Sequence, residues 1–339
     1  MKLYKFGFVV LAFVLITICP YFAAALDSST KTKIAEAYSQ LEKMGHTGHG
    51  YFTQTIAPIG SDAVPELMNY YQKSNPEVKS VLIRTSMDMD AKCEAVAGAL
   101  TDALSSSHLL LKIAAISFVG GRGCNSFERE LRGVIQAANN NHVLKVALFE
   151  YGGVAGGSDA SFIESYQNNA SLPVDIRLVA AKSLLQVAGR ADLTLIGHAL
   201  KAGGRSEKEA ALAALAFSRD QNNIRTLEDF LRQPQPDPSL AMIAESSIEE
   251  IKINTLSENY AVRRDKLFEN LRSEKTMVRN HAFLRLLGRY KNDDVVNRLR
   301  SLAADTGYAY REEVLLRLMS KGWVPGEDVK SQLNRRGPF

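Results

Sequence analysis

The chain repeats itself at intervals of about 32 residues, and this periodicity restricts its fold more than any other feature. A basic residue recurs near the start of a helix-like stretch, and these residues form a basic column: Lys79, Lys112, Lys145, Arg177, Lys208, Arg279 and Arg311. The first three intervals are 33, 33 and 32 residues, and the last is 32. A constant period of this size indicates stacked units, each of which buries its apolar face only against its neighbours.

Each repeat contains the pattern of two helices. Leu193, Ile196, Gly197 and Leu200 have the spacing of a helical stripe that faces a core. Glycine pairs between such segments are typical of helix ends, and no run alternates with a period of two. The sequence therefore predicts an all-α fold of about eight helix pairs, over residues 61–86, 91–120, 125–152, 159–188, 191–217, 221–253, 255–290 and 293–321.

The sixth repeat departs from this pattern. It has Leu240 and Ala241 where the other repeats have a basic residue, and 38 residues separate Ala241 from Arg279. This longer interval predicts an insertion around residues 252–262.

The repeat resembles the short HEAT-like repeats. Residues 62–67 (DAVPEL) and 75–79 (NPEVK) are similar to the two helices of one such unit, in which the second helix opens with an acidic or amide residue before Val-Arg or Val-Lys. The resemblance covers about residues 61–321 and implies an α-solenoid of about eight stacked HEAT-like helix pairs. The acidic residue of the family, four positions before the basic one, is mostly absent, so we expect an incomplete ladder of ion pairs between repeats.

The first 25 residues have the three parts of a secretory signal. Lys2 and Lys5 precede an apolar run over residues 6–19, and small residues at 23–25 suit cleavage after Ala25. An uncleaved membrane anchor is the weaker alternative, since the run is short for a span. We expect export to the periplasm or out of the cell, and no transmembrane segment in the mature chain.

The predicted organisation has four parts. They are a signal peptide (1–25), an N-terminal capping helix with a Gly/His-containing loop (26–60), the HEAT-like repeats (61–322), and a C-terminal cap and tail (323–339). The mature part retains two cysteines, Cys93 and Cys124, about one repeat apart. In an oxidising compartment we expect them to form a disulfide rather than to act as reactive thiols.

Few residues point to chemistry. His46 and His49 are the one close histidine pair, and they could contribute to a metal site, but the glycines around them favour a flexible loop. The chain contains no HExxH, no phosphate-binding glycine loop followed by Lys-Ser/Thr, and no GxSxG. We therefore expect no cofactor.

Charge leaves two interpretations open. The basic column could present cations to an acidic partner, or it could pack its stems over the core and bond neighbouring turns, which we favour. From residue 261 onward, 17 Lys and Arg face 10 Asp and Glu, a net +7, so an anionic partner could bind the C-terminal third. The whole chain is nearly balanced at +4, which argues against nucleic acid as the partner.

Together these features predict an exported, non-catalytic scaffold that binds another macromolecule, most simply a protein, through one face of the repeats. In the family, enzymes of the hydroxylase kind carry His-Glu pairs, and this chain has no His-Glu dipeptide. The alternative is an exported enzyme, or a ligand-binding or metal-binding protein, with a pocket inside the curve.

Overall fold

The computed structural model describes residues 26–234, 237–257, 259–288, 290 and 293–319. Within these ranges the chain is all-helical: 79% of it is helix and it has no strand. The predicted signal peptide (1–25) and C-terminal cap (323–339) lie outside the described residues. Among the helices that are described, none is both long and apolar enough to cross a bilayer.

The α-helices follow one another in pairs, each with a first and a second helix. From the second pair onward, their bounds agree with the predicted pairs to within a few residues. The pairs are α1 (Ser28–Met44) and α2 (His49–Ile56), α3 (Val64–Tyr71) and α4 (Pro76–Asp88), α5 (Ala97–Ser105) and α6 (Leu109–Arg122), α7 (Glu128–Ala137) and α8 (Asn141–Tyr151), α9 (Ala160–Gln167) and α10 (Val174–Ala188), α11 (Leu193–Ala202) and α12 (Arg205–Leu215), α13 (Asn222–Leu231) and α14 (Pro238–Leu256), α15 (Tyr260–Asn270) and α16 (Thr276–Leu287), and α17 (Asp293–Ala304) and α18 (Arg311–Met319).

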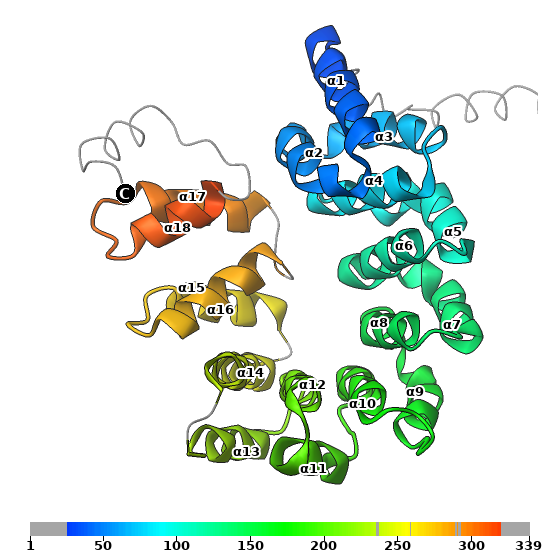
Figure 1. Ribbon diagram of the computed structural model, residues 1–339. Coiled ribbons are helices and arrows are strands. Elements are labelled where there is room, and N and C mark those ends of the chain that lie inside the picture. The colour runs from blue at the N-terminus through cyan, green and yellow to red at the C-terminus, as the bar shows by residue number, and fades with distance from the viewer. Residues whose placement is uncertain (1–25, 235–236, 258, 289, 291–292, 320–339) are drawn as a thin grey trace, which may run out of the picture.

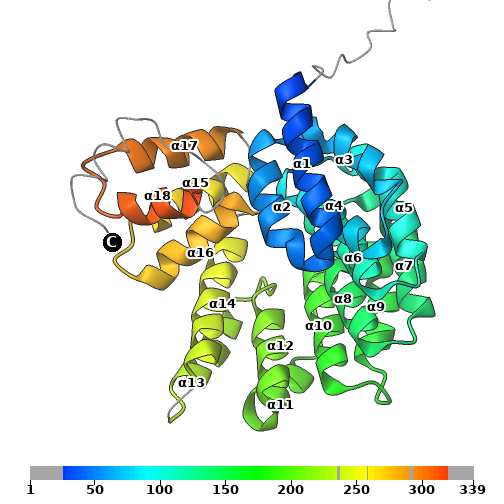
Figure 2. The same cartoon turned by 45° about the horizontal axis from the view of Figure 1, so that its top comes forward.

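The second helices form a continuous row. Each of α2, α4, α6, α8, α10, α12 and α14 packs against the next second helix, up to α16. Figure 1 shows that this row is curved. The second helices α4, α6, α8, α10, α12 and α14 lie on the inside of the curve, and the first helices α5, α7, α9, α11 and α13 lie on the outside. In the turned view of Figure 2, α1–α4 and α15–α18 are the two ends of the curve.

Local sequence explains where the second helices begin. Asn75 caps α4 by accepting a hydrogen bond from the Val78 amide at 3.0 Å, and Pro76 is the first helical residue, where its missing N–H costs nothing. Asp237 and Pro238 repeat this arrangement at the start of α14. Polar cap and proline together restart the helix after each of these two turns.

The apolar core is divided into three clusters along the row. The first extends from Ile34 to Leu184 and the second from Leu178 to Ile251, so that both include residues of α10. The third begins at Ile253, on the same helix as Ile251, and ends at Leu318. Helix α14 therefore carries the boundary between the second core and the third.

The prediction of a loop within residues 26–60 is wrong. Residues 45–48 form a 3-10 turn, and α2 follows immediately. Phe52 and Ile56, four residues apart, are fully buried, and Gly48 packs so closely on α1 that an added Cβ would lie 3.0 Å from the Met44 Cβ. Burial of these apolar side chains stabilises a helix that the glycines alone would disfavour. The N-terminal segment is thus a further helix pair.

The insertion predicted around residues 252–262 is mostly helical. α14 has 19 residues, against 11 or 12 in its neighbours α12 and α16, and it ends at Leu256. The extra residues lengthen the helix instead of forming a loop.

Glycines bring the C-terminal ends of three second helices close together. A Cβ added to Gly120 of α6 would lie 2.8 Å from the Cα of Glu150 on α8. A Cβ on Gly152, just after α8, would lie 3.0 Å from the Cα of Ser183 on α10, and one on Gly153 would lie 2.8 Å from the carbonyl oxygen of Gly120. Only glycine permits this spacing.

Candidate functional site

Two lysines of the basic column, Lys79 and Lys145, connect one helix pair to the next. Lys79 of α4 donates to the Asp102 carboxylate of α5 at 2.9 Å, and its ammonium lies 4.7 Å from the centre of the Tyr71 ring. Hydrogen bonds from Lys79 and Tyr71 lower the pKa of Asp102. Lys145 of α8 makes the equivalent bond to Asp175 of α10, at 2.8 Å.

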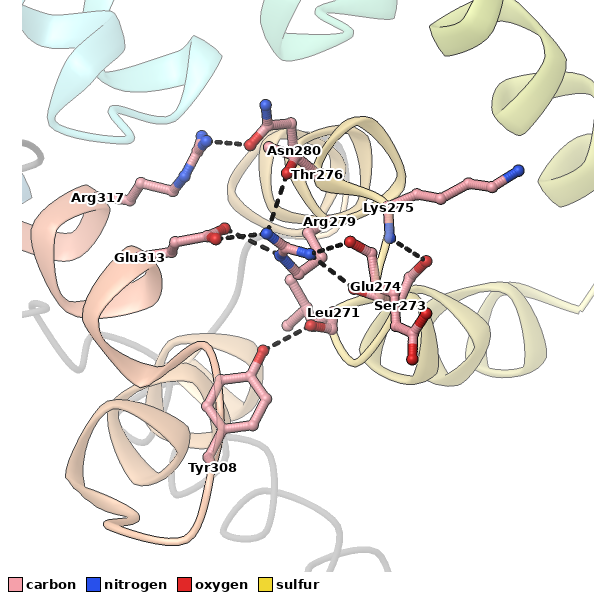
Figure 3. Close-up of polar contacts among 10 residues, drawn as sticks. All are labelled: Leu271, Ser273, Glu274, Lys275, Thr276, Arg279, Asn280, Tyr308, Glu313 and Arg317. Atoms are coloured by element: carbon pink, nitrogen blue, oxygen red, sulfur yellow. Dashed lines mark hydrogen bonds and ion pairs between the residues drawn. The ribbon is translucent and has the colours of Figure 1, made fainter.

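Arg279 makes the densest set of contacts in the column (Figure 3). It donates to the carbonyl oxygens of Ser273 and Glu274 at 2.8 and 2.9 Å, and to the Glu313 carboxylate of α18. Its guanidinium also lies over the Tyr310 ring, at 3.7 Å. The side chain is 7% exposed, so this buried arginine closes the turn before α16 and attaches α18 at the same time.

The remaining members of the column divide into two groups. Arg177 and Arg311 donate to carbonyl oxygens at the C-terminal end of the first helix of their own pair, those of Gln167 on α9 and Ala303 on α17. Lys112 and Lys208 are half-buried and bond to no acceptor among the described residues. Lys79, Lys145 and Arg279 therefore bond across junctions between helix pairs, whereas Arg177 and Arg311 bond within their own pair.

The arginines of the C-terminal third also have acidic partners nearby. Arg264 lies 3.2 Å from Asp294, and Arg298 lies 2.8 Å from Asp265. These contacts offset part of the positive charge that the sequence concentrates there.

Cys93 and Cys124 form a disulfide in the structure. Their sulfur atoms are 2.01 Å apart and their Cα atoms 5.7 Å apart. The bond joins the turn before α5 to the residue that follows the C-terminal turn of α6, and Cys124 is buried. The disulfide therefore links the start of the α5–α6 helix pair to its end.

His46 and His49 do not share a set of ligands. The Nδ1 atom of His46 lies 3.4 Å from the Glu77 carboxylate, and His49 Nε2 is buried without a hydrogen-bond partner. Burial and the charge of Arg84 lower the pKa of His49. Over the described part of the chain, no group of three or more His, Cys, Asp and Glu side chains is arranged to hold a metal.

The most unusual chemistry is buried where α8 and α10 pack together, and no sequence motif points to it. Lys182 of α10 is 4% exposed, and its ammonium donates to the Phe149 carbonyl oxygen at 2.6 Å. The rings of Phe149 and Phe217 lie 3.8 and 4.6 Å from that ammonium. The neighbouring carboxylate is that of Glu150, which packs against Gly120.

Both ionisable groups of this pair are strongly perturbed. Burial raises the pKa of Glu150 to about 7, against the opposing attraction of Lys182. Burial lowers the pKa of Lys182 to about 8; the charge of Glu150 partly offsets this effect, and the charge of Arg285 adds to it. A buried acid and a buried amine that both titrate near neutral pH are a candidate site for proton transfer or ligand binding.

A second buried polar cluster lies between α14 and α16. Glu250 is 4% exposed in its side chain and bonds to His281 Nε2 at 2.8 Å and to Arg285 Nε at 2.6 Å. Burial alone would raise the pKa of Glu250, but the hydrogen bond from His281 and the charge of Arg285 lower it to about 2. This cluster occupies the boundary between the second and third apolar cores.

The repeat itself contains a signal for the first of these sites. Glu150 and Lys182 each stand five residues after a member of the basic column, Lys145 and Arg177. Opposite charges at one repeat position in consecutive units will face each other if the units stack. Comparing this position across repeats would have identified the pair.

Comparison with known proteins adds no relative. No protein-family model matches the chain, and no curated protein matches it.

Proposed function

We propose that this protein is an α-solenoid of HEAT-like helix pairs that acts, after export, as a non-catalytic scaffold for another protein. The continuous row of second helices supports the solenoid, and so do the bonds of Lys79, Lys145 and Arg279 between neighbouring helix pairs. The inner side of the curve is the proposed binding face.

One observation carries the binding proposal: exposed apolar side chains gather on the second helices. Among the described residues, twelve large apolar side chains are exposed, and four of them, Met44, Leu193, Tyr260 and Val262, lie on first helices. The other eight lie on second helices: Tyr51, Leu109, Phe149, Met242, Leu256, Leu284, Leu316 and Met319. Apolar surface that collects on one side of a protein marks an interaction site.

Two leucines show this most clearly. Leu284 and Leu316 are 63% and 50% exposed, and each stands five residues after a basic residue of the column, the position that Lys182 occupies on α10. The same repeat position is thus charged in the middle of the row and apolar at its C-terminal end. We expect the partner to contact this end through apolar side chains.

The test is affinity capture with crosslinking from the native compartment, using the exported protein and two variants. Leu284→Glu combined with Leu316→Glu places charge on the proposed face, and Val262→Glu places it on a first helix as the matched control. One stoichiometric protein that is captured by the wild type and the control, but lost by the double variant, supports the proposal. Equal capture by all three proteins refutes the inner face as the binding site.

A second candidate function follows from Glu150 and Lys182. Their perturbed pKa values and the aromatic rings around Lys182 favour a small ligand bound inside the curve, with or without chemistry. A ligand screen by thermal stability would separate the two: stabilisation that disappears in Lys182→Met, a variant that keeps the aliphatic stem, supports this alternative.

Export is part of the proposal, and two features support it: the signal-like residues 1–25 and the paired cysteines. Mass spectrometry of unreduced protein from the envelope or the medium tests both. A chain that starts at Leu26 and carries no free thiol is the expected result, and an intact N-terminus with Cys93 and Cys124 both free contradicts it.

A further inference from the structure

Arg84 on α4 is an arginine whose donors are unused. It is half-buried, and it makes no hydrogen bond or ion pair with any described residue. Each of the other half-buried arginines in the described ranges reaches an oxygen atom: Arg132 lies 3.0 Å from Asp159, for example, and Arg298 lies 2.8 Å from Asp265. A guanidinium has five N–H donors and a permanent charge, so Arg84 can still bind an acceptor.

Arg84 occupies the repeat position of the proposed binding face. It stands five residues after Lys79 of the basic column, the spacing that also places Leu284 and Leu316. Its helix, α4, lies on the inside of the curve in Figure 1. Among the described side chains, the buried atoms that lack a partner do not include its nitrogens, so the guanidinium is accessible to solvent. The face therefore has a cation near its N-terminal end and apolar side chains at its C-terminal end.

Helix α2 is fixed beside this arginine. Thr53 of α2 and Thr85 of α4 share a hydrogen bond of 2.8 Å, and Thr85 is fully buried. His49, also on α2, is close enough to feel the guanidinium: burial and then the charge of Arg84 lower the pKa of its imidazole. At neutral pH His49 is therefore uncharged, and the positive charge at this place is that of the arginine.

The nearest carboxylate along the helix does not neutralise it. Asp88 stands one turn beyond Arg84, is exposed, and forms no ion pair with it in the described chain. An arginine four residues before an acid on a helix is the weaker order for such a pair. A carboxylate that approaches from outside and accepts two parallel hydrogen bonds can therefore compete with Asp88.

We propose that Arg84 binds a carboxylate, supplied by an acidic side chain of the protein that the inner face recognises. This inference rests on the proposed function. The planar guanidinium matches a carboxylate in a bidentate geometry, and partial burial strengthens their attraction relative to a pair in open water. The partner then meets α4 with an acidic group and α16 and α18 with apolar groups, which fixes its direction along the row.

Titration with sodium glutarate tests the site without any partner. In the isotope-labelled mature chain, the Nε–Hε signal of Arg84 is identified by its absence from Arg84→Gln. Arg129 is the matched control, because it is an exposed arginine on α7 that bonds to no described residue. With sodium chloride keeping the ionic strength constant, the Arg84 signal should shift and saturate, and the Arg129 signal should shift far less. Equal shifts, or none, would overturn the site.

Affinity capture with Arg84→Glu and Arg129→Glu tests the source of the carboxylate. The protein captured by the wild type should be recovered about 10-fold less with Arg84→Glu and equally with Arg129→Glu. Arg84 bonds to nothing in the described chain, so its replacement should leave the thermal unfolding curve unchanged, and Arg84→Gln should give a smaller loss in the same direction.

The outcomes separate this inference from the proposed function. Equal capture by Arg84→Glu and the wild type overturns the role of Arg84, whereas the variants at Leu284 and Leu316 report on the inner face independently. If the wild type captures no partner, the proposed function fails and the titration decides alone. A saturable shift in that case refutes the protein as the source and leaves a site for a free carboxylate.

Discussion

Replacing Glu150 by glutamine should change how the stability of this protein depends on pH. In the folded chain the carboxyl has a pKa of about 7, because burial against Gly120 penalises its ionised form, whereas its ordinary value is 4.5. Between these values the folded protein holds a proton that the unfolded chain has released. Stability contributed by this group is therefore complete below pH 4.5 and falls as the pH rises to 7.

The size of the effect follows from the two pKa values. A difference of about 2.5 units corresponds to about 3 kcal/mol at pH 8, where both folded and unfolded chains have ionised Glu150. The substituted amide has no proton to lose and keeps the shape of the side chain. The variant should match the wild type at pH 4.5 and exceed it by up to about 3 kcal/mol at pH 8.

Urea unfolding followed by circular dichroism, at intervals from pH 4.5 to 8, measures this difference. Glu245→Gln is the matched control, because Glu245 is an exposed glutamate on α14. Its stability profile should run parallel to that of the wild type. If Glu150→Gln also runs parallel, the carboxyl is hydrated in the folded protein, and the argument for a perturbed site on α8 and α10 is refuted.

Three further results are expected from unfolding measurements. Gly120→Ala should cost about 1–3 kcal/mol because its Cβ overlaps α8, whereas Gly133→Ala, with open space around it, should stabilise by about 0.5–1 kcal/mol; similar values for the two would contradict the close packing of α6 and α8. Arg279→Met should cost about 2–3 kcal/mol, since it leaves carbonyl groups and a carboxylate without their donor; a neutral result would remove the arginine from the set of structural contacts. Replacing both Cys93 and Cys124 by Ser should cost about 3–4 kcal/mol for a loop of 31 residues, measured against oxidised wild type; the same loss should follow reduction of the wild type, and no loss in either case would show that the bond is not formed.

The helix pairs could be predicted well because their boundaries are encoded locally. Asn75 with Pro76 and Asp237 with Pro238 specify a cap and a first turn regardless of what packs around them. The Gly/His-containing loop predicted within residues 26–60 failed for the opposite reason. Its glycines are local signals against a helix, and the burial of Phe52 against neighbouring helices, which decides the outcome, is not local.

The candidate site was harder to predict for a related reason. A charged residue inside an amphipathic helix is normally placed facing water, and Glu150 and Lys182 would each satisfy that expectation alone. Their burial depends on how closely α8 and α10 approach, which is set by glycines outside the charged positions. The apolar stripe of α11 is the opposite case, an apolar residue expected in the core that is exposed. Its spacing predicts the helix correctly, but it does not predict that Leu193 stays exposed.

The glycine contacts at the ends of α6, α8 and α10 also divide the molecule mechanically. There, backbone touches backbone, so bending the row would force main-chain atoms together or apart at once. Between α14 and α18 the adjoining helices are joined by the third apolar core and by long side chains, those of Arg285 with Glu250 and Arg279 with Glu313, which can tilt while their bonds persist. Pulled from its two ends, the protein would behave as a spring with a stiff N-terminal half, and its C-terminal half would extend first.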